Sequence, residues 1–133
     1  MSPRENLYYA LGEMIYALSS VDGKIQKTEK DKLHEILTYE FSPEHPPIDY
    51  AEIVFKVFEK DHVSVQQAFD GAKHEFKLNS HYLSPKMKTH FIKVVQEVAH
   101  IYPPVTPEEQ KMVNEFQAFM TTLQGDPVFY NGH

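Results

Sequence analysis

VDGKIQKTEKDKL, residues 21–33, lies between two runs of apolar residues and decides the fold. Its Asp-Gly pair favours a sharp reversal, because Gly accepts positive φ and the Asp carboxylate can accept hydrogen bonds from nearby backbone N–H groups. Ile25 is expected to return to the core, and the acidic residues that follow suit the positive end of a helix dipole. The stretch therefore predicts a helix-loop-helix joint.

The pattern around this joint returns late in the chain at one constant offset, with Ile25 aligned on Val105. The other aligned pairs are Leu11 with Phe91, Met14 with Val94, Ile15 with Val95, Leu18 with Val98, Val21 with Ile101, Glu29 with Glu109, Leu33 with Val113 and Ile36 with Phe116. Apolar residues align with apolar residues, and one Glu aligns with another. We interpret this as two related helix-loop-helix repeats separated by an inserted middle segment.

These residues carry a family resemblance. The segment Leu7–Leu37 contains Leu18-Ser19-Ser20-Val21-Asp22-Gly23-x-Ile25-x-x-x-Glu29-x-x-x-Leu33. It resembles the tellurite-resistance TerB family, and it is similar to the N-terminal domain of the membrane-bound co-chaperone DjlA. That family normally has a second copy of the motif, which Val98–Phe116 matches loosely. The resemblance covers both repeats and matches the middle third poorly.

The resemblance implies a non-enzymatic stress-response or metal-associated accessory domain. The matching acidic positions in the family form a cluster proposed to bind metal, and carry-over gives Asp22, Glu29 and Glu109 as ligands here. The implied cofactor is a divalent ion, with Ca²⁺, Mg²⁺ and Zn²⁺ left open. Independently, a pseudo-twofold repeat would bring the two joints together, and a hard cation held by oxygen ligands relieves the repulsion between neighbouring carboxylates.

Each of these acids also has a structural interpretation. Asp22 fits a turn residue before Gly23, and Glu109 fits a capping box with Thr106. A purely structural interpretation is weaker for Glu29. Gln26 stands where the second repeat has the capping residue Thr106, and Gln is a poor N-cap. The second repeat has Tyr102-Pro103 in place of Asp-Gly, so the symmetric Asp is lost. The sequence therefore predicts a one-sided, weak cation site.

Composition restricts the class of protein. The 133 residues suit a single domain, which we place at 1–124 with a tail at 125–133. The net charge of −6 disfavours nucleic acid as a partner, and no apolar run is long enough for a membrane helix. Cysteine is absent, and the N-terminus lacks a signal-peptide apolar region. We expect a cytoplasmic protein that does not span a membrane.

Every periodic segment has helical spacing and none alternates, so we predict an all-α bundle of six to seven helices. Cap and proline signals place six helices along the chain. They are about Pro3–Ser20, Thr28–Phe41, a helix that begins at Asp49, Ser64–Asn79, a helix from Pro85 to about Tyr102, and a helix from Pro107 to Gly125. The prolines of 42–47 are expected to separate the second and third helices. The apolar face predicted for the third helix is Tyr50, Ile53, Val54, Val57 and Phe58.

An alternative function is a protein-protein interaction module without a ligand site. Tyr8, Tyr9 and Tyr16 lie along the first helix, and adjacent Tyr8 and Tyr9 cannot both face the core. A protein partner or a homo-oligomer would fit this alternative. Lys86, Lys88, His90 and Lys93 also make the fifth helix locally basic, a pattern usual for a solvated face.

Overall fold

The computed structural model describes residues 2–21, 31–32, 34–35, 45–101 and 105–123; within 45–101, side chains are described from residue 51 onward. Throughout these ranges the chain is helical or in turns, without strands, so the predicted all-α class is confirmed. The helices are α1 (Pro3–Ser20), α3 (His45–Lys60), α4 (Val65–Leu78), α5 (Pro85–Ala99) and α6 (Pro107–Thr122), with a 3₁₀ turn η1 (Ser80–Tyr82). Residues 31–32 and 34–35 are also helical. The predicted number of six to seven helices is not confirmed by the described ranges.

Four helices begin where the sequence predicts, because a hydroxyl side chain accepts a hydrogen bond from the third residue of each helix. Ser2, Ser64, Ser84 and Thr106 are these N-caps. The caps of α1 and α6 are full capping boxes, in which a Glu carboxylate also accepts from the cap's own backbone N–H. The sequence therefore encodes these starts locally.

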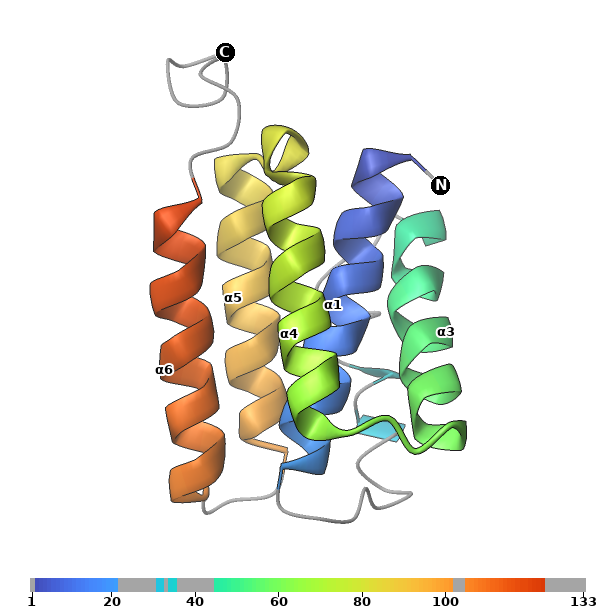
Figure 1. Cartoon of the computed structure of the whole chain (residues 1–133), viewed down its shortest axis with the longest axis vertical. Helices are drawn as coiled ribbons and strands as arrows, with labels where there is room; N and C mark the ends of the chain where they lie inside the picture. Colours follow the sequence, from blue (N-terminus) through green and yellow to red (C-terminus); the bar gives the residue numbers. More distant parts are fainter. Residues whose placement is uncertain (1, 22–30, 33, 36–44, 102–104, 124–133) are drawn as a thin grey trace.

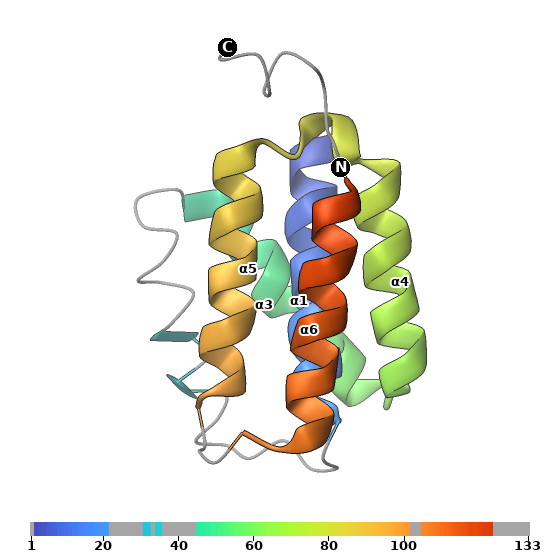
Figure 2. The same ribbon diagram turned by 90° about the vertical axis from the view of Figure 1, so that its left-hand side faces the viewer.

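Helix α1 occupies the centre of the bundle (Figures 1 and 2). It packs most extensively against α3 and α4, then against α5, while α6 packs mainly on α5. Helices α1 and α4 run in opposite directions (Figure 1). The middle pair, which we had interpreted as an insertion, thus supplies the main partners of α1. The repeat itself stays a prediction, because residues 22–30 of its first joint are outside the described ranges.

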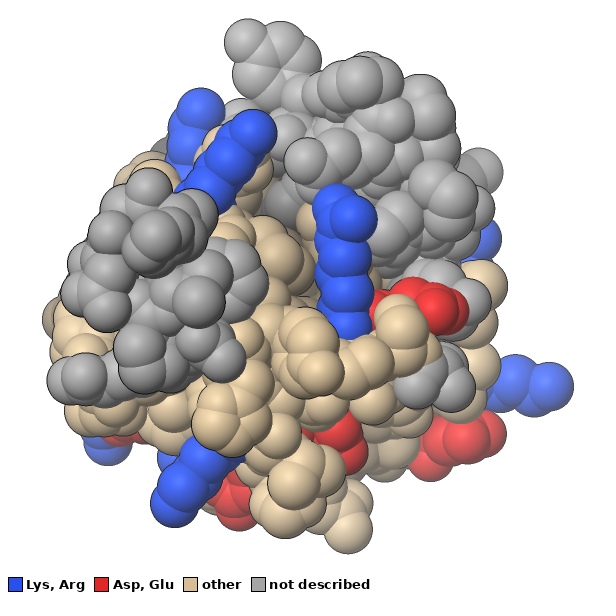
Figure 3. Space-filling model, turned by 90° about the horizontal axis from the view of Figure 1, so that it is seen from above, with Lys and Arg blue, Asp and Glu red and all other residues tan. Residues whose placement is uncertain are grey.

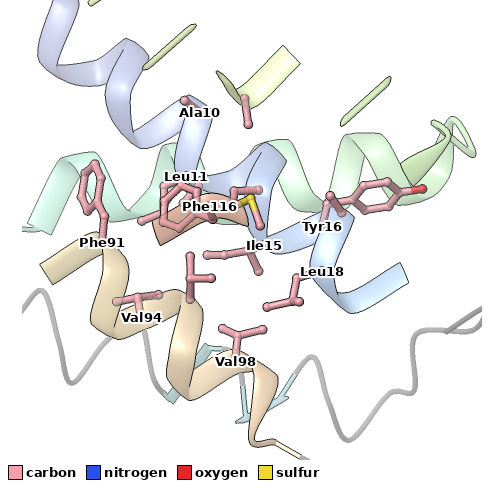
Figure 4. Close-up of a cluster of buried hydrophobic side chains, with 14 of the residues drawn as sticks. Ala10, Leu11, Ile15, Tyr16, Leu18, Phe91, Val94, Val98 and Phe116 are labelled. Atoms are coloured by element: carbon pink, nitrogen blue, oxygen red, sulfur yellow. The ribbon is translucent and has the colours of Figure 1, made fainter. Parts of the chain in front are cut away.

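The core surrounds α1 on every side. From Leu7 to Leu18 all its residues except Tyr9 are buried, whereas an ordinary surface helix buries one stripe. Leu11, Ile15 and Leu18 face Val94 and Val98 of α5 (Figure 4). Neighbouring aromatic rings connect the outer helices to this centre, with centroid distances of 5.2 Å for Tyr8–Phe91, 6.0 Å for Phe76–Phe91 and 5.7 Å for Phe76–Phe116.

The predicted start of α3 is wrong. We expected prolines 46 and 47 to separate two helices and Asp49 to cap the second, but α3 begins at His45 and includes both prolines in its first turn. Proline is tolerated there because the first backbone N–H groups of a helix have no intrahelical acceptor to lose. The helix is consequently one turn longer than the sequence suggested.

The predicted inward face of α3 is also partly wrong. Val54 is buried and Phe58 is half-buried as expected, but Ile53 is 56% exposed and Val57 is 47% exposed, while Ala51 and Phe55 are buried in addition. The close approach of α1 explains the rotation. A Cβ atom on Gly12 would lie 2.5 Å from the Ala51 carbonyl oxygen, so two small residues form the contact. Tyr50 is among the side chains not described.

We predict that Gly12→Ala lowers the free energy of unfolding by about 1–3 kcal/mol, because the new methyl group meets the backbone of α3. Alanine's helix propensity, better than that of glycine by about 1 kcal/mol, acts in the opposite direction. Urea unfolding measures the difference. Glu115→Ala, at an exposed position on α6, is the control for a substitution by alanine away from this contact. A Gly12→Ala protein as stable as the wild type would contradict the close contact.

Candidate functional site

Of the three predicted metal ligands, Asp22, Glu29 and Glu109, the structure describes Glu109. Asp22 and Glu29 lie outside the described ranges. Glu109 forms the capping box of α6: its backbone N–H donates to Thr106 Oγ1 at 3.1 Å, and its Oε1 accepts from the Thr106 N–H at 3.1 Å. The structural interpretation of Glu109 is thus confirmed. Within the described ranges, no three His, Asp or Glu residues converge as a metal-binding group would.

A different acidic feature lies along α1. Tyr9, Glu13, Tyr16 and Ser20 recur at helical spacing and form a polar stripe on this otherwise apolar helix. Tyr9 and Tyr16 contact Phe58 of α3, with ring centroids 6.5 Å and 5.7 Å away. The Tyr16 hydroxyl donates to the backbone oxygen of Val63, just before α4, at 2.6 Å. The stripe therefore follows the seam between α3 and α4, which pack on α1 more than on each other.

Glu13 is the exceptional member of the stripe. Its side chain is only 5% exposed, and its Oε1 has no hydrogen-bond partner among the described residues. Its other oxygen, Oε2, faces Gly71 of α4, where a Cβ atom would lie 2.5 Å away. Gly71 thus provides the space in which the carboxyl group sits. A buried carboxyl oxygen without a partner is costly, so this group requires an explanation.

Glu75 lies one helical turn beyond Gly71 on α4 and is half-buried. Helices α1 and α4 are antiparallel. Gly71 lies opposite Glu13, so Glu75, one turn later on α4, lies toward Tyr9, one turn earlier on α1. Asn79 follows another turn later; its Nδ2 donates to the Glu75 backbone oxygen at 2.9 Å and approaches Glu75 Oε2 at 3.4 Å. We call Tyr9, Glu13, Glu75 and Asn79 the acidic seam.

Burial and mutual repulsion determine the charge state of the acidic seam. Burial, followed by the nearby charge of Glu75, raises the pKa of Glu13 from 4.5 to about 8. Burial also raises the pKa of Tyr9, with smaller contributions from Glu13 and Glu75. Among the described residues, no cation contributes to either pKa shift. At neutral pH Glu13 is therefore mainly a neutral carboxylic acid beside a second carboxyl group.

This arrangement has two chemical capacities. A protonated Glu13 can donate a hydrogen bond, and an ionised Glu13 with Glu75 can provide two carboxylates to one cation. Tyr9 and Glu75 are only half-buried, so the seam reaches the protein surface. We infer that solvent and small ions approach Glu13 past these two side chains.

Sequence reasoning missed the acidic seam. On a helical wheel Glu13 falls nearly opposite the apolar stripe, on the side that an amphipathic helix would turn to water. The sequence around Glu13 did contain a signal of its burial. Apolar and small residues, including Ala10, Gly12 and Ala17, occupy most of the circumference of α1 at this level. A helix without a clear polar face is expected to be central, and its few polar residues are then buried.

Comparisons with known proteins add no assignment: no protein-family model matches the chain, and no significant match was found among curated proteins or solved structures.

We predict that Glu13 makes stability fall as pH rises. The carboxyl pKa is raised by folding, so the folded state holds a proton that the unfolded state releases above its ordinary value of 4.5. The stabilising effect is fully present below that value and is lost as pH approaches about 8. The free energy of unfolding of the wild type should fall relative to Glu13→Gln by roughly 1 kcal/mol per pH unit.

Urea unfolding at about pH 5.5, 6.5 and 7.5 provides the measurement. Glu115→Gln, at an exposed position on α6, is the matched control and should track the wild type at every pH. Parallel curves for the wild type and Glu13→Gln would contradict a proton held on Glu13.

Proposed function

We propose that this chain is a non-enzymatic, TerB-like accessory domain that binds a divalent cation, and that the acidic seam between α1 and α4 is the binding site. The observation that carries the proposal is the 95% buried Glu13 carboxyl group, with one oxygen unpartnered among the described residues and with Glu75 beside it. A cation would displace the proton of Glu13, satisfy that oxygen and balance the charge of the two carboxylates.

The donor atoms indicate the class of cation. Two carboxylates, the Asn79 amide oxygen and the Tyr9 hydroxyl are all oxygen donors, and sulfur and imidazole are not among them. Oxygen donors suit hard ions such as Ca²⁺, Mg²⁺ and Mn²⁺ better than Zn²⁺. These groups number fewer than the six to eight ligands that Ca²⁺ prefers, so water would complete the shell and affinity would be modest.

The TerB resemblance supports the same general function through other residues. It assigns metal binding to Asp22, Glu29 and Glu109, whereas the described packing favours Glu13 and Glu75. Glu109 already caps α6 through both its backbone N–H and its carboxylate. A site at Asp22 and Glu29 stays a separate prediction, and the experiment below distinguishes the two locations. The stress-response role is part of this proposal.

We predict that Ca²⁺, Mg²⁺ or Mn²⁺ binds the wild type in calorimetric titration and raises its melting temperature, because a ligand selective for the folded state stabilises it. At an ion concentration about 100 times Kd the stabilisation is about 2.7 kcal/mol. Glu13→Gln should abolish both effects, since the amide is neutral and occupies the same space. Glu75→Gln should weaken binding by at least about tenfold, because one of two carboxylates remains.

Two further variants locate the site. Asp22→Asn/Glu29→Gln leaves the acidic seam intact and should bind like the wild type. Glu109→Gln tests the capping acid and should reduce stability without changing ion affinity. Loss of binding in Asp22→Asn/Glu29→Gln, with binding retained in Glu13→Gln, would place the site at the joint instead. A wild type that binds none of these ions would overturn the proposal.

An interaction module is a second candidate, and it needs a different surface from the one the sequence suggested. Tyr8 and Tyr16 are buried and Tyr9 is half-buried, so the tyrosines of α1 do not form an exposed interface. The outer face of α3 instead exposes Ile53 and Val57, one helical turn apart. Two neighbouring apolar side chains on one helix face favour contact with another protein, including a second copy of this chain.

For self-association through α3, we predict that the sedimentation coefficient of the wild type rises with concentration and that Ile53→Ser/Val57→Ser prevents the rise. Removing the exposed apolar groups removes the area that a dimer would bury. Lys56→Gln/Lys60→Gln, on the same helix, is the control for a general surface effect. A wild type that stays monomeric at high concentration would contradict this second candidate for the homo-oligomeric case.

A further inference from the structure

Charge is unevenly distributed along this acidic chain. Residues 76–96 contain four of the 13 Lys and Arg residues, and none of the 19 Asp and Glu residues. This segment includes the end of α4, the turn η1 and most of α5. It therefore forms a basic segment in a protein whose net charge is −6.

Two large apolar side chains protrude within the basic segment. Leu78, the last residue of α4, is 65% exposed, and Tyr82, the last residue of η1, is 54% exposed. Lys77 precedes Leu78, Lys86 lies in the first turn of α5, and both lysines are exposed. Lys88 and Lys93 are less available, because Lys88 Nζ donates to the Leu123 backbone oxygen and Lys93 Nζ lies 4.0 Å from Glu97.

These residues lie at one end of the bundle. The beginnings of α1 and α5 and the ends of α4 and α6 meet there (Figure 1). Viewed onto this end, Lys and Arg side chains project from the described part of the surface, which is largely uncharged; acidic groups lie beside one of them and toward the rim (Figure 3). Of the acids on neighbouring turns, Glu5 is engaged in the capping box of α1 and Glu75 belongs to the acidic seam. We call Lys77, Leu78, Tyr82 and Lys86 the basic tip.

The basic tip fits an anionic lipid surface better than an acidic protein. Its apolar groups lie at the turn between two helices, whereas a specific protein interface needs about 800 Å² of complementary surface per partner. Leucine and tyrosine enter the headgroup region of a bilayer readily, and tyrosine is enriched at that depth. Exposed lysines beside them are attracted to anionic headgroups.

We propose that the basic tip docks this protein peripherally onto membranes that contain anionic phospholipids. Leu78 and Tyr82 enter the interfacial layer, while Lys77 and Lys86 contact the headgroups. Segregation of the acidic residues to the rest of the chain reduces repulsion during docking. In the described ranges no helix is long and apolar enough to cross a bilayer, so the contact is at the surface.

Flotation of the full chain with vesicles tests the proposal. The wild type should bind phosphatidylcholine vesicles that contain about 30 mol% phosphatidylserine, should release at high salt, and should not bind pure phosphatidylcholine. Lys77→Gln/Lys86→Gln and Leu78→Ser/Tyr82→Ser should each reduce the partition coefficient by about tenfold or more. All four positions are exposed, so unchanged thermal melts should accompany the loss.

The matched control comes from α3. Lys56→Gln/Lys60→Gln makes the same charge change at exposed positions and should change partition less than about twofold. Equal losses in the tip and α3 variants would overturn the proposal, as would absent or salt-insensitive binding to phosphatidylserine vesicles. Binding to soluble polyglutamate that needs the lysines but not Leu78 and Tyr82 would instead assign the tip to an acidic protein.

Discussion

Enclosure of α1 on all sides is the constraint on which the rest of this structure depends. A central helix needs apolar or small residues around its whole circumference, and α1 provides them from Leu7 to Leu18 with few exceptions. Gly12 allows α3 to approach at backbone distance, and Gly71 of α4 leaves room for the Glu13 carboxyl group. The polar residues of this stretch that turn away from the core, Tyr9 and Glu13, are therefore placed at the seam.

That placement makes Glu13 a cost to the fold. Burying a carboxyl group raises its pKa, and an unpartnered oxygen adds a desolvation penalty. A leucine or glutamine at this position would avoid the charge, because buried ionisable groups are often replaceable by neutral residues without loss of stability. Local rules are typically broken at functional sites, which is why the acidic seam, rather than the capped Glu109, carries the proposed function.

The starts of α1, α4, α5 and α6 could be predicted because a cap and its acceptor are separated by only three residues. The rotation of α3 could not, since Ile53 and Ala51 both fit helical apolar faces and the choice depends on contact with Gly12, far away in sequence. Glu13 was missed for the same reason: a helical wheel cannot show whether a third and fourth helix will cover the polar side. Among the predicted ligands, the structural role of Glu109 could be inferred from the sequence, because its capping contact joins it to a residue only three positions away.

Helix α4 illustrates how one element serves three environments. Phe69, Ala72 and Phe76 face the core, Gly71 and Glu75 line the seam, and Lys77 and Leu78 end at the basic tip. The core-facing and seam-lining residues point in different directions because of helical periodicity, whereas Lys77 and Leu78 differ from both because they lie at the end of the helix. Because Glu75 precedes Leu78 by less than one turn, the acidic seam and the basic tip are adjacent but differently solvated. Salt should therefore screen the attraction between the exposed lysines and anions far more than the electrostatic interactions of the buried Glu13 carboxyl group.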